Sequence, residues 1–244
     1  MKLIDAINNL GATSARKVVK NTAMDILGNF PTGMKVVFNA CCNNLELIPT
    51  IKQRNGTEAD VIKKWVDKYI SGYKNRISSR HSNLPATSPD PMVNLIIKTR
   101  LIHLNQKDLE SIKSAHRLSM SAENILGLFL EEYLAVNIER FGWHFAWGET
   151  IKSVDFCHDN GSLFQIKNRS NSENSSSSQV RRGTTINKWH RSNAITGEYY
   201  WGDLNNILGT NILNEESFRG FVIEAINNNP NCLAIEPDNH WLAR

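Results

Sequence analysis

The sequence predicts a mixed α/β protein of the α+β kind, in which a helical N-terminal region precedes a mixed β-sheet flanked by helices. Two stretches, 57–77 and 105–142, repeat their apolar residues at the 3.6-residue period of a helix. After Gly142 the pattern changes to short β-rich runs, and near the C-terminus it returns to that of a helix. Helices before and after a group of strands predict a sheet covered by helices.

The first predicted element is an amphipathic helix in 57–77, with Thr57 and Glu58 as its start signals. Its apolar stripe consists of Val61, Ile62, Trp65, Val66, Tyr69 and Ile70. Ser, Pro and Asn then gather in 78–94, which predicts a connector. We therefore divide the chain into a helical N-terminal region, 1–90, and a core, 91–244.

The second helical stretch, 105–142, could be one long helix or two. Its predicted stripe is Ala115, Leu118, Ala122, Leu126, Phe129, Tyr133 and Val136. The runs GWHFAWGE, TIKSVDFC and SLFQIK follow as predicted strands of a β-meander. The segment NEESFRGFVIEAINNNP closes the chain as a helix, with Asn214 as N-cap and Pro230 as stop.

The amino-acid composition excludes fewer classes of protein than the order of apolar and polar residues does. The chain has 244 residues, of which 41% are hydrophobic, which is enough to bury a large core. It contains neither eighteen consecutive apolar residues nor an apolar leader, so we expect a cytoplasmic protein. The four cysteines lack the spacing of a zinc site or a disulfide framework, and a net charge of +4 permits an anionic partner without requiring one.

The segment VDFCHDNGSLFQIKN has the pattern of a β-hairpin with chemistry on one face. Alternation along a strand puts Gln165 and Lys167 on one side, and Phe164 and Ile166 on the other. A three-residue loop at 159–161, with Gly161 in the left-handed place, would set Asp155 opposite Gln165. A carboxylate, an amide oxygen and an ammonium group would then share a face, as a site for phosphodiester cleavage with a divalent ion requires. The alternative is a solvated hairpin with Gln165 and Lys167 on its wet face.

A second acid is sought on a neighbouring helix, because one carboxylate is weak support for a metal ion. Glu123 is followed by Leu126, Gly127 and Leu130 at helical spacing, which places its carboxylate on a largely apolar face. A metal ion would relieve the cost of burying that charge. The alternative for Glu123 is an acid near a helix start, in favourable interaction with the helix dipole.

The order of helix acid, Asp, and hairpin ending in QxK resembles the PD-(D/E)XK nuclease superfamily. The segments HRLSMSAENILGLFLEEYLA and VDFCHDNGSLFQIKN resemble SinI-type Type II restriction endonucleases. The likeness is plain over 91–169, looser to the C-terminus and weak over the first eighty residues. It implies an αβββαβ core, Mg²⁺-dependent hydrolysis of double-stranded DNA at a short specific sequence, and a homodimer.

Carried over by residue, the resemblance makes Asp155 the first motif acid, Gln165 the second motif position, Lys167 the motif lysine and Glu123 the helix acid. On this hypothesis Asp155, Glu123 and the Gln165 carbonyl oxygen hold Mg²⁺, while Lys167 positions the attacking water. Two departures from the family pattern stand out. Val154 replaces the usual proline, and Gln165 replaces an Asp or Glu, which removes one negative charge from the metal site.

The serine-rich tract after Lys167 and the segment beyond it predict DNA contacts. Hydroxyl, amide and guanidinium groups are the donors that contact phosphates and base edges. The predicted DNA-binding residues are Asn168, Arg169, Ser172, Arg181, Arg182, Lys188 and Arg191. The aromatic residues between 189 and 201 are left to packing.

The function predicted from these features is that of a Type II restriction endonuclease. Two other functions fit parts of the pattern: a structure-selective or repair nuclease with the same cluster, and a noncatalytic DNA-binding regulator. Cleavage into discrete fragments, into a ladder, or not at all would separate the three. A metabolic hydrolase lacks support, because the chain has no Gly-rich phosphate loop, GxSxG or HExxH pattern.

Overall fold

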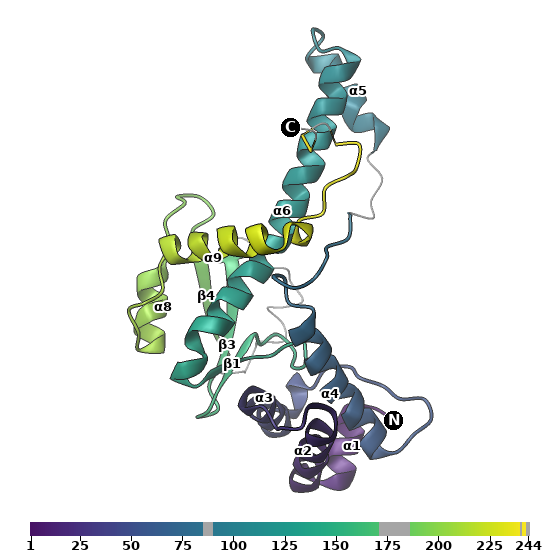
Figure 1. Ribbon diagram of the computed structural model, residues 1–244, viewed down its shortest axis with the longest axis vertical. Coiled ribbons are helices and arrows are strands. Elements are labelled where there is room, and N and C mark those ends of the chain that lie inside the picture. The colour runs from purple at the N-terminus through teal and green to yellow at the C-terminus, as the bar shows by residue number, and fades with distance from the viewer. Residues whose placement is uncertain (85–89, 171–185, 240, 243–244) are drawn as a thin grey trace.

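Helices cover both faces of a small sheet in the computed structural model, which describes residues 1–84, 90–170, 186–239 and 241–242 (Figure 1). The helices in these residues are α1 (Leu3–Leu10), α2 (Ala12–Leu27), α3 (Thr32–Asn43), α4 (Glu58–Lys74), α5 (Pro91–Arg100), α6 (Gln106–Ile138), α8 (Trp201–Leu208) and α9 (Glu215–Asn228). The strands are β1 (Trp143–Phe145), β2 (Phe156–His158), β3 (Leu163–Arg169) and β4 (Ile186–Ser192). The predicted mixed α/β fold is confirmed.

The sheet has the strand order β1-β2-β3-β4, with the first two pairs antiparallel and β3–β4 parallel. The order α6, β1, β2, β3, β4 matches the core implied by the resemblance. Residues 171–185, where that core would have its second helix, lie outside the described residues. Two local predictions were wrong: 151–154 form turns instead of extending β2, and 186–192, not predicted as a strand, form β4.

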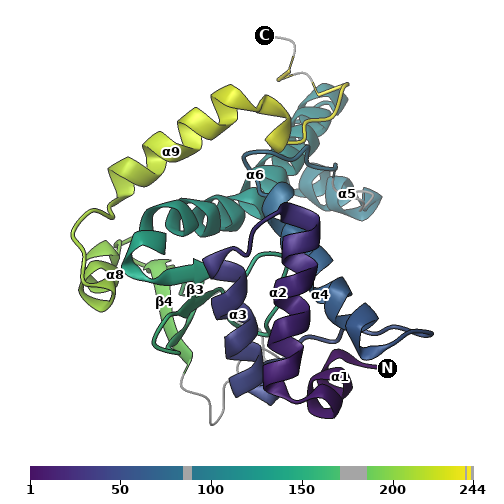
Figure 2. The ribbon, with the colours of Figure 1, turned by 60° about the horizontal axis from the view of Figure 1, so that its bottom comes forward.

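One face of the sheet carries the N-terminal helices. Cys157 and Leu163 lie in a single apolar cluster with Leu3, Phe38 and Trp65, so α1, α3 and α4 cover this face (Figure 2). The predicted helix at 57–77 is α4, which begins with a reciprocal Thr57–Asp60 capping box. All six residues of its predicted stripe belong to this cluster or pack against it. The N-terminal helices therefore take part in the same core as β2 and β3.

The other face carries α6, α8 and α9. Phe164 and Ile166 of β3 and Trp189 of β4 are buried there, together with Phe129 and Tyr133 of α6. The stretch 105–142 forms one long helix, α6, which ends at Ile138. Its stripe was partly wrong, because Val136 is 65% exposed and the buried positions near it include Leu134 and Ile138. The closing helix is confirmed as α9, where the Asn214 side chain accepts a hydrogen bond from the Ser217 N–H.

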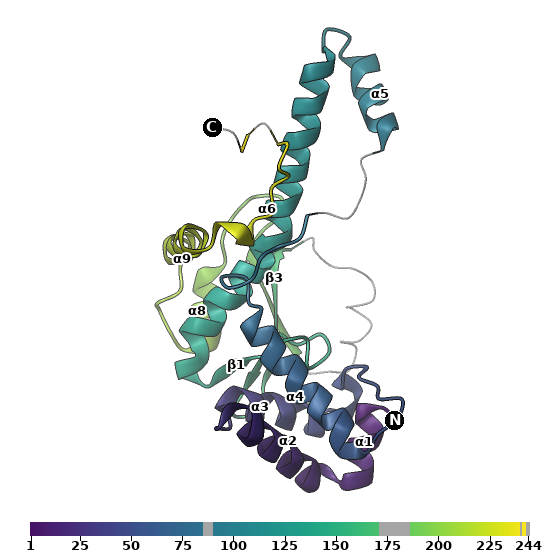
Figure 3. The ribbon, with the colours of Figure 1, turned by 45° about the vertical axis from the view of Figure 1, so that its right-hand side comes forward.

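A helical arm extends from this body. The helix α5 begins at Pro91, inside the expected connector, with the Asp90 side chain capping it by a bond from the Met92 N–H. It lies antiparallel to the first half of α6, and the two helices project away from the sheet and the other helices (Figures 1 and 3). The connector prediction is thus wrong for its last residues.

Candidate active site

The segment between β1 and β2 is held against α4 by close backbone contact. A Cβ atom at Gly72 would lie 2.2 Å from the backbone nitrogen of Gly148, and one at Gly148 would lie 2.2 Å from the Lys68 carbonyl oxygen. Glycine at both positions lets the two backbones meet. The Thr150 carbonyl oxygen accepts a 2.8 Å hydrogen bond from Trp65 Nε1, which fixes the same segment to α4. Asp155 therefore follows a segment whose position is set by the N-terminal helices.

The carboxylate of Asp155 takes the place of a backbone group at the point where β2 and β3 diverge. The backbone N–H of Asp155 donates to the Phe164 carbonyl oxygen at 2.9 Å, and the backbone carbonyl oxygen of Asp155 accepts from the Ala146 N–H at 2.8 Å. The Ile166 N–H donates to Asp155 Oδ2 at 2.7 Å. Ser153, two residues earlier, has φ of 57°. This left-handed conformation costs free energy for any residue that carries a side chain. Hydrogen bonds of both the main chain and the side chain of Asp155 thus hold this residue in one orientation.

The predicted hairpin register is confirmed. Phe156 pairs with Phe164 and Cys157 with Leu163, so the next position sets Asp155 opposite Gln165. The loop is the three residues 159–161, and Gly161 has φ of 90°. Gln165 is 4% exposed, and Lys167 lies two residues further along the same face.

A carboxylate from α6 joins this pair. Asp155, Lys167 and Glu131 line one cavity of about 1070 Å³, between α4, α6, and the segment that leads into β2. Glu131 and Asp155 are each half-buried. Glu131 was not predicted, although the run LFLEEYLA carries a signal for it. Two adjacent acids within an apolar stretch place at least one near the buried stripe of the helix.

Burial perturbs both carboxyl groups. Desolvation raises the pKa of Glu131 above its usual range, and the negative charge of Asp155 raises it further, while Lys167 lowers it. Desolvation also raises the pKa of Asp155, against the lowering effects of the Ile166 N–H and of Lys167. Two acids and one ammonium group therefore share a desolvated site, and their charges act on one another.

Two arginines from the segment after α4 line the same cavity, with different partners. Arg76 pairs with the buried Glu132 at 3.3 Å, and Glu132 also accepts a 2.9 Å bond from the Ser78 N–H. The Nε of Arg80 is buried and, among the residues that the structure describes, has no hydrogen-bond partner. The Arg80 charge helps lower the pKa of Glu131, as the last of the causes acting on that group. Arg76 is thus held by its ion pair with Glu132, whereas Arg80 lines the cavity and its Nε has no hydrogen-bond partner among the described residues.

A comparison with known families bears on this site. The family model described as SinI restriction endonuclease matches residues 18–228. The chain belongs to the SinI restriction endonuclease family. It is 43% identical over 143 residues to the Type II restriction enzyme Eco47I of Escherichia coli, and 42% identical over 143 residues to the Type II restriction enzyme SinI of Salmonella infantis. Either match covers 57% of this chain and 62% of the relative, so the chain spans about three-fifths of the length of these curated relatives.

Glu123 of this SinI-family chain lies apart from the cavity. It is exposed on α6, eight residues before Glu131, which is roughly 12 Å along a helix axis. Gln165 is on the face of Asp155 and Lys167, but it is buried and does not line the cavity. The structure thus brings together Asp155, Lys167 and the unpredicted Glu131 around the cavity, and leaves Gln165 buried outside its lining.

The predicted DNA-binding residues of the SinI-family chain fall into three groups. Ser172, Arg181 and Arg182 lie outside the described residues. Arg169 is exposed at the end of β3, and Lys188 pairs with Gln165 across β3 and β4. The pKa of Lys188 is lowered by desolvation and by the charge of Lys167, so this amine belongs to the electrostatic surroundings of the site.

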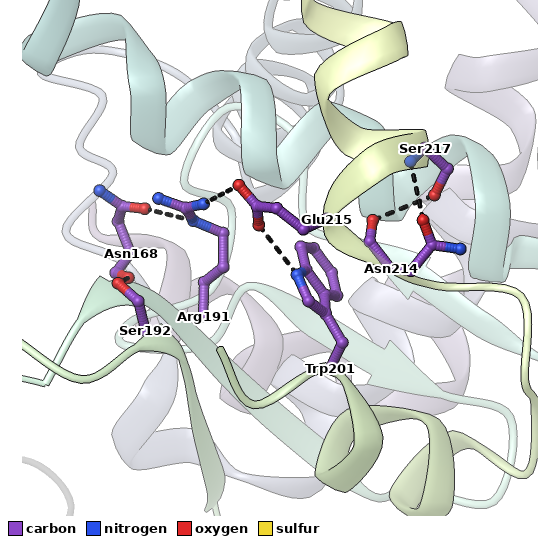
Figure 4. A network of polar contacts seen from close by, with 7 residues as sticks. All are labelled: Asn168, Arg191, Ser192, Trp201, Asn214, Glu215 and Ser217. Atoms are coloured by element: carbon purple, nitrogen blue, oxygen red, sulfur yellow. Dashed lines mark hydrogen bonds and ion pairs between the residues drawn. The ribbon is translucent and has the colours of Figure 1, made fainter. Parts of the chain in front are cut away.

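Asn168 and Arg191, the third group, bond to each other. Arg191 is 8% exposed, and its guanidinium donates to Asn168 Oδ1 at 2.8 Å and to Glu215 Oε1 at 2.6 Å (Figure 4). Glu215 also accepts from Trp201 Nε1 at 2.9 Å. This network joins β3, β4, α8 and α9. The expected packing role of the aromatics is confirmed for Trp189 and Trp201, which are 4% and 6% exposed.

In the part of the SinI-family chain that the structure describes, none of the helices combines the length and the apolar character that crossing a bilayer demands.

Proposed function

We propose that this chain is a Type II restriction endonuclease, which hydrolyses phosphodiester bonds of double-stranded DNA at a short specific sequence with Mg²⁺. The observation that carries the proposal is the cavity shared by Asp155, Glu131 and Lys167 in a member of a restriction endonuclease family. An acid and a lysine from a β-hairpin, with a second acid from the neighbouring helix α6, are the groups expected for cleavage of a phosphodiester with a divalent ion.

The donor set suits Mg²⁺ better than a transition metal. Among the described residues, no group of three or more His, Cys, Asp or Glu side chains could hold a metal ion by itself. Mg²⁺ commonly uses only one or two carboxylates and keeps several waters, whereas zinc sites have three or four protein ligands. Beside desolvation, the negative charge of Asp155 contributes to raising the pKa of Glu131, and a cation between the two carboxylates would offset that repulsion. Asp155 and Glu131 would hold the cation, whereas Gln165, which is buried and does not line the cavity, is no longer proposed as a ligand.

The protein groups then have separate tasks. When bound, the cation would supply a Lewis acid that offsets charge on the scissile phosphate. The ammonium group of Lys167 would orient the attacking water and offset the charge that develops on the phosphate oxygens. The bond from the Ile166 N–H keeps Asp155 aimed at the cavity. In this proposal Glu131 takes the place that the resemblance gave to Glu123, and Glu123 serves as a control position.

We also propose that the chain acts as a homodimer. A short, nearly palindromic DNA site has two-fold symmetry, which a dimer with two-fold symmetry matches. Each of the two active sites would then cut one strand.

Digestion of a sequenced plasmid with Mg²⁺, followed by mapping of the ends, tests the function. We expect discrete fragments whose ends share one sequence, and loss of cleavage when the metal is chelated or Lys167 is changed to alanine. A ladder of fragments would indicate a nuclease without sequence readout. DNA binding with no cleavage at any divalent ion would overturn the enzymatic proposal.

A further inference from the structure

The residues that follow α4 are held by hydrogen bonds from two other parts of the chain. We call residues 78–82 the Arg80 segment. At its start, the Ser78 N–H donates to the buried Glu132 of α6 at 2.9 Å. At its end, the Ser82 N–H donates to the carbonyl oxygen of Asn231, which follows α9, at 2.9 Å. The backbone of the Arg80 segment is thus fixed to both α6 and the C-terminal part of the chain.

Asn229, the C-cap residue of α9, makes two further bonds to the same segment. Its Nδ2 donates to the Arg80 carbonyl oxygen at 2.9 Å and to the Ser78 carbonyl oxygen at 3.2 Å. A side-chain amide has two N–H donors and can serve both carbonyl groups at once, which a hydroxyl group with one donor cannot do. The main chain at Arg80 therefore cannot shift without the loss of at least one bond to Asn229.

The side chain of Arg80 brings a positive charge to the cavity of Asp155. Arg80 lines this cavity and also a smaller one, of about 390 Å³, against α6. Its buried Nε has no hydrogen-bond partner among the described residues, whereas the guanidinium of Arg76 pairs with Glu132 at 3.3 Å. Desolvation raises the pKa of Glu131, and the charge of Arg80 is among those that lower it again. Arg80 thus acts electrostatically on a carboxylate of the site.

A guanidinium group suits a phosphate for geometric reasons. Its N–H donors lie in one plane and can bond two phosphate oxygens at once. Lys167 supplies a compact charge to the same cavity, so an arginine there adds direction as well as charge. A main chain that is already fixed also has less conformational freedom to lose when the ligand binds. These properties make Arg80 suited to binding a phosphate in the cavity.

We propose that Arg80 binds the nonbridging oxygens of the scissile phosphate, and that Asn229 is the residue that positions it. This inference rests on the proposed function and adds to the site a second cation, from outside the hairpin. The charge that develops on the phosphate is then offset by Lys167 and Arg80 together. Asn229 touches no substrate and acts only through the backbone of the Arg80 segment.

A double-mutant cycle on the cleavage rate tests the positioning role. We expect Arg80→Gln to lower kcat by about 10²-fold, because one group that stabilises the developing charge is lost. Asn229→Ala should lower kcat by about 10-fold or more, since small displacements of such a group cost up to about 10²-fold. In the Arg80→Gln background the same change should cost less than about two-fold, because the group that it positions is gone. Equal losses in both backgrounds, or full activity of Arg80→Gln, would overturn the proposal.

Asn205→Ala is the matched control. The Asn205 side chain also holds a backbone segment, by donating to the Leu213 carbonyl oxygen at 2.8 Å and accepting from the Leu213 N–H at 3.2 Å. It lines neither cavity, so Asn205→Ala should lose stability and keep the wild-type kcat. Each rate is measured below the melting temperature of its variant. If Asn229→Ala does not fold, Asn229→Ser, which keeps one donor, takes its place in the cycle.

DNA binding without a divalent ion gives a second measurement, which a purely structural role would leave unchanged. The slope of log K against log salt should fall by about 0.9 in Arg80→Gln and part of the way in Asn229→Ala, and stay at the wild-type value in Asn205→Ala. A wild type that binds DNA and does not cut it ends the enzymatic proposal, while the slopes still test the Arg80 contact. A wild type that cuts, with variants equal to it in rate and slope, ends this inference alone.

Discussion

The backbone N–H of Ile166 donates a 2.7 Å hydrogen bond to Oδ2 of Asp155, across the gap where β2 and β3 part. One carboxylate therefore closes the end of a strand pair and supplies a charge to the cavity. The two roles use different properties of the side chain, since an uncharged oxygen can accept the bond but cannot replace the charge.

Asp155→Asn and Asp155→Ala should separate these two roles. The amide oxygen of Asn can still accept from Ile166, so we expect Asp155→Asn to melt at or above the temperature of the wild type, with cleavage reduced by about 10²-fold or more. Alanine leaves that N–H without its partner and should lower the free energy of unfolding by about 1–3 kcal/mol. Thermal unfolding and cleavage rates measured on both variants check this. Equal stability of the two would show that the bond to Ile166 contributes nothing.

Glu131→Gln and Glu123→Gln form a matched pair on one helix. We expect Glu131→Gln to lose about 10²-fold or more in cleavage rate and to need more Mg²⁺ for half-maximal activity, because a cation ligand loses its charge. Glu123→Gln should keep the rate within about two-fold, since this exposed side chain does not line the cavity. The opposite result would restore Glu123 as the helix acid of the site.

The raised pKa of Glu131 predicts how stability without metal depends on pH. The folded state holds the proton more tightly than the unfolded chain, so the free energy of unfolding is highest below about pH 4.5 and falls as pH rises through the folded pKa. The slope for one such group is at most about 1.4 kcal/mol per pH unit. Mg²⁺ should reverse the trend, because it binds the deprotonated form. Urea titrations across pH with and without Mg²⁺ check both signs, and Glu131→Gln should flatten the metal-free curve.

Local sequence signals identified the hairpin of the site correctly. Alternation gave the faces of Gln165 and Lys167, and the three-residue loop gave the register of Asp155, because both depend on neighbouring residues only. The same holds for the capped starts of α4 and α9. The family resemblance supplied the chemistry that these positions suggest.

The helix acid and the β4 strand could not be obtained in this way. Which of Glu123 and Glu131 meets Asp155 depends on how far α6 slides along the sheet, and its apolar period is broad enough to allow both. The composition of residues 186–192 is basic and aromatic, which suggested a DNA-facing segment. In the structure this segment pairs with β3 as a strand, and Trp189 and Arg191 are buried. Contacts between segments distant in sequence decided both outcomes.

Arg80→Ala tests whether the guanidinium group of Arg80, which lines the cavity, contacts a DNA phosphate. The segment that carries Arg80 is fixed from the far end of the chain, because Asn229 Nδ2 donates to the Arg80 carbonyl oxygen at 2.9 Å. Loss of one phosphate contact should weaken DNA binding equally for all sequences and reduce the slope of log K against log salt by about 0.9. Arg76→Ala is the control: it should lower stability, by leaving Glu132 without its cation, and keep the salt slope. An unchanged slope in Arg80→Ala would exclude the phosphate contact.

Arg191 offers the sharpest contrast between a DNA contact and a structural contact. Its guanidinium is enclosed by Asn168 and Glu215, so removing either charge of the Arg191–Glu215 pair should cost the fold about 3–5 kcal/mol. We expect Arg191→Met and Glu215→Ala each to lower the unfolding free energy by that amount. The double variant should lose less than the sum of the two single losses, because no charge is then left buried alone. Chemical denaturation of the three variants measures the coupling. If Arg191→Met instead kept its stability and reduced the salt slope of DNA binding, the sequence-based assignment of Arg191 as a phosphate contact would be the better one.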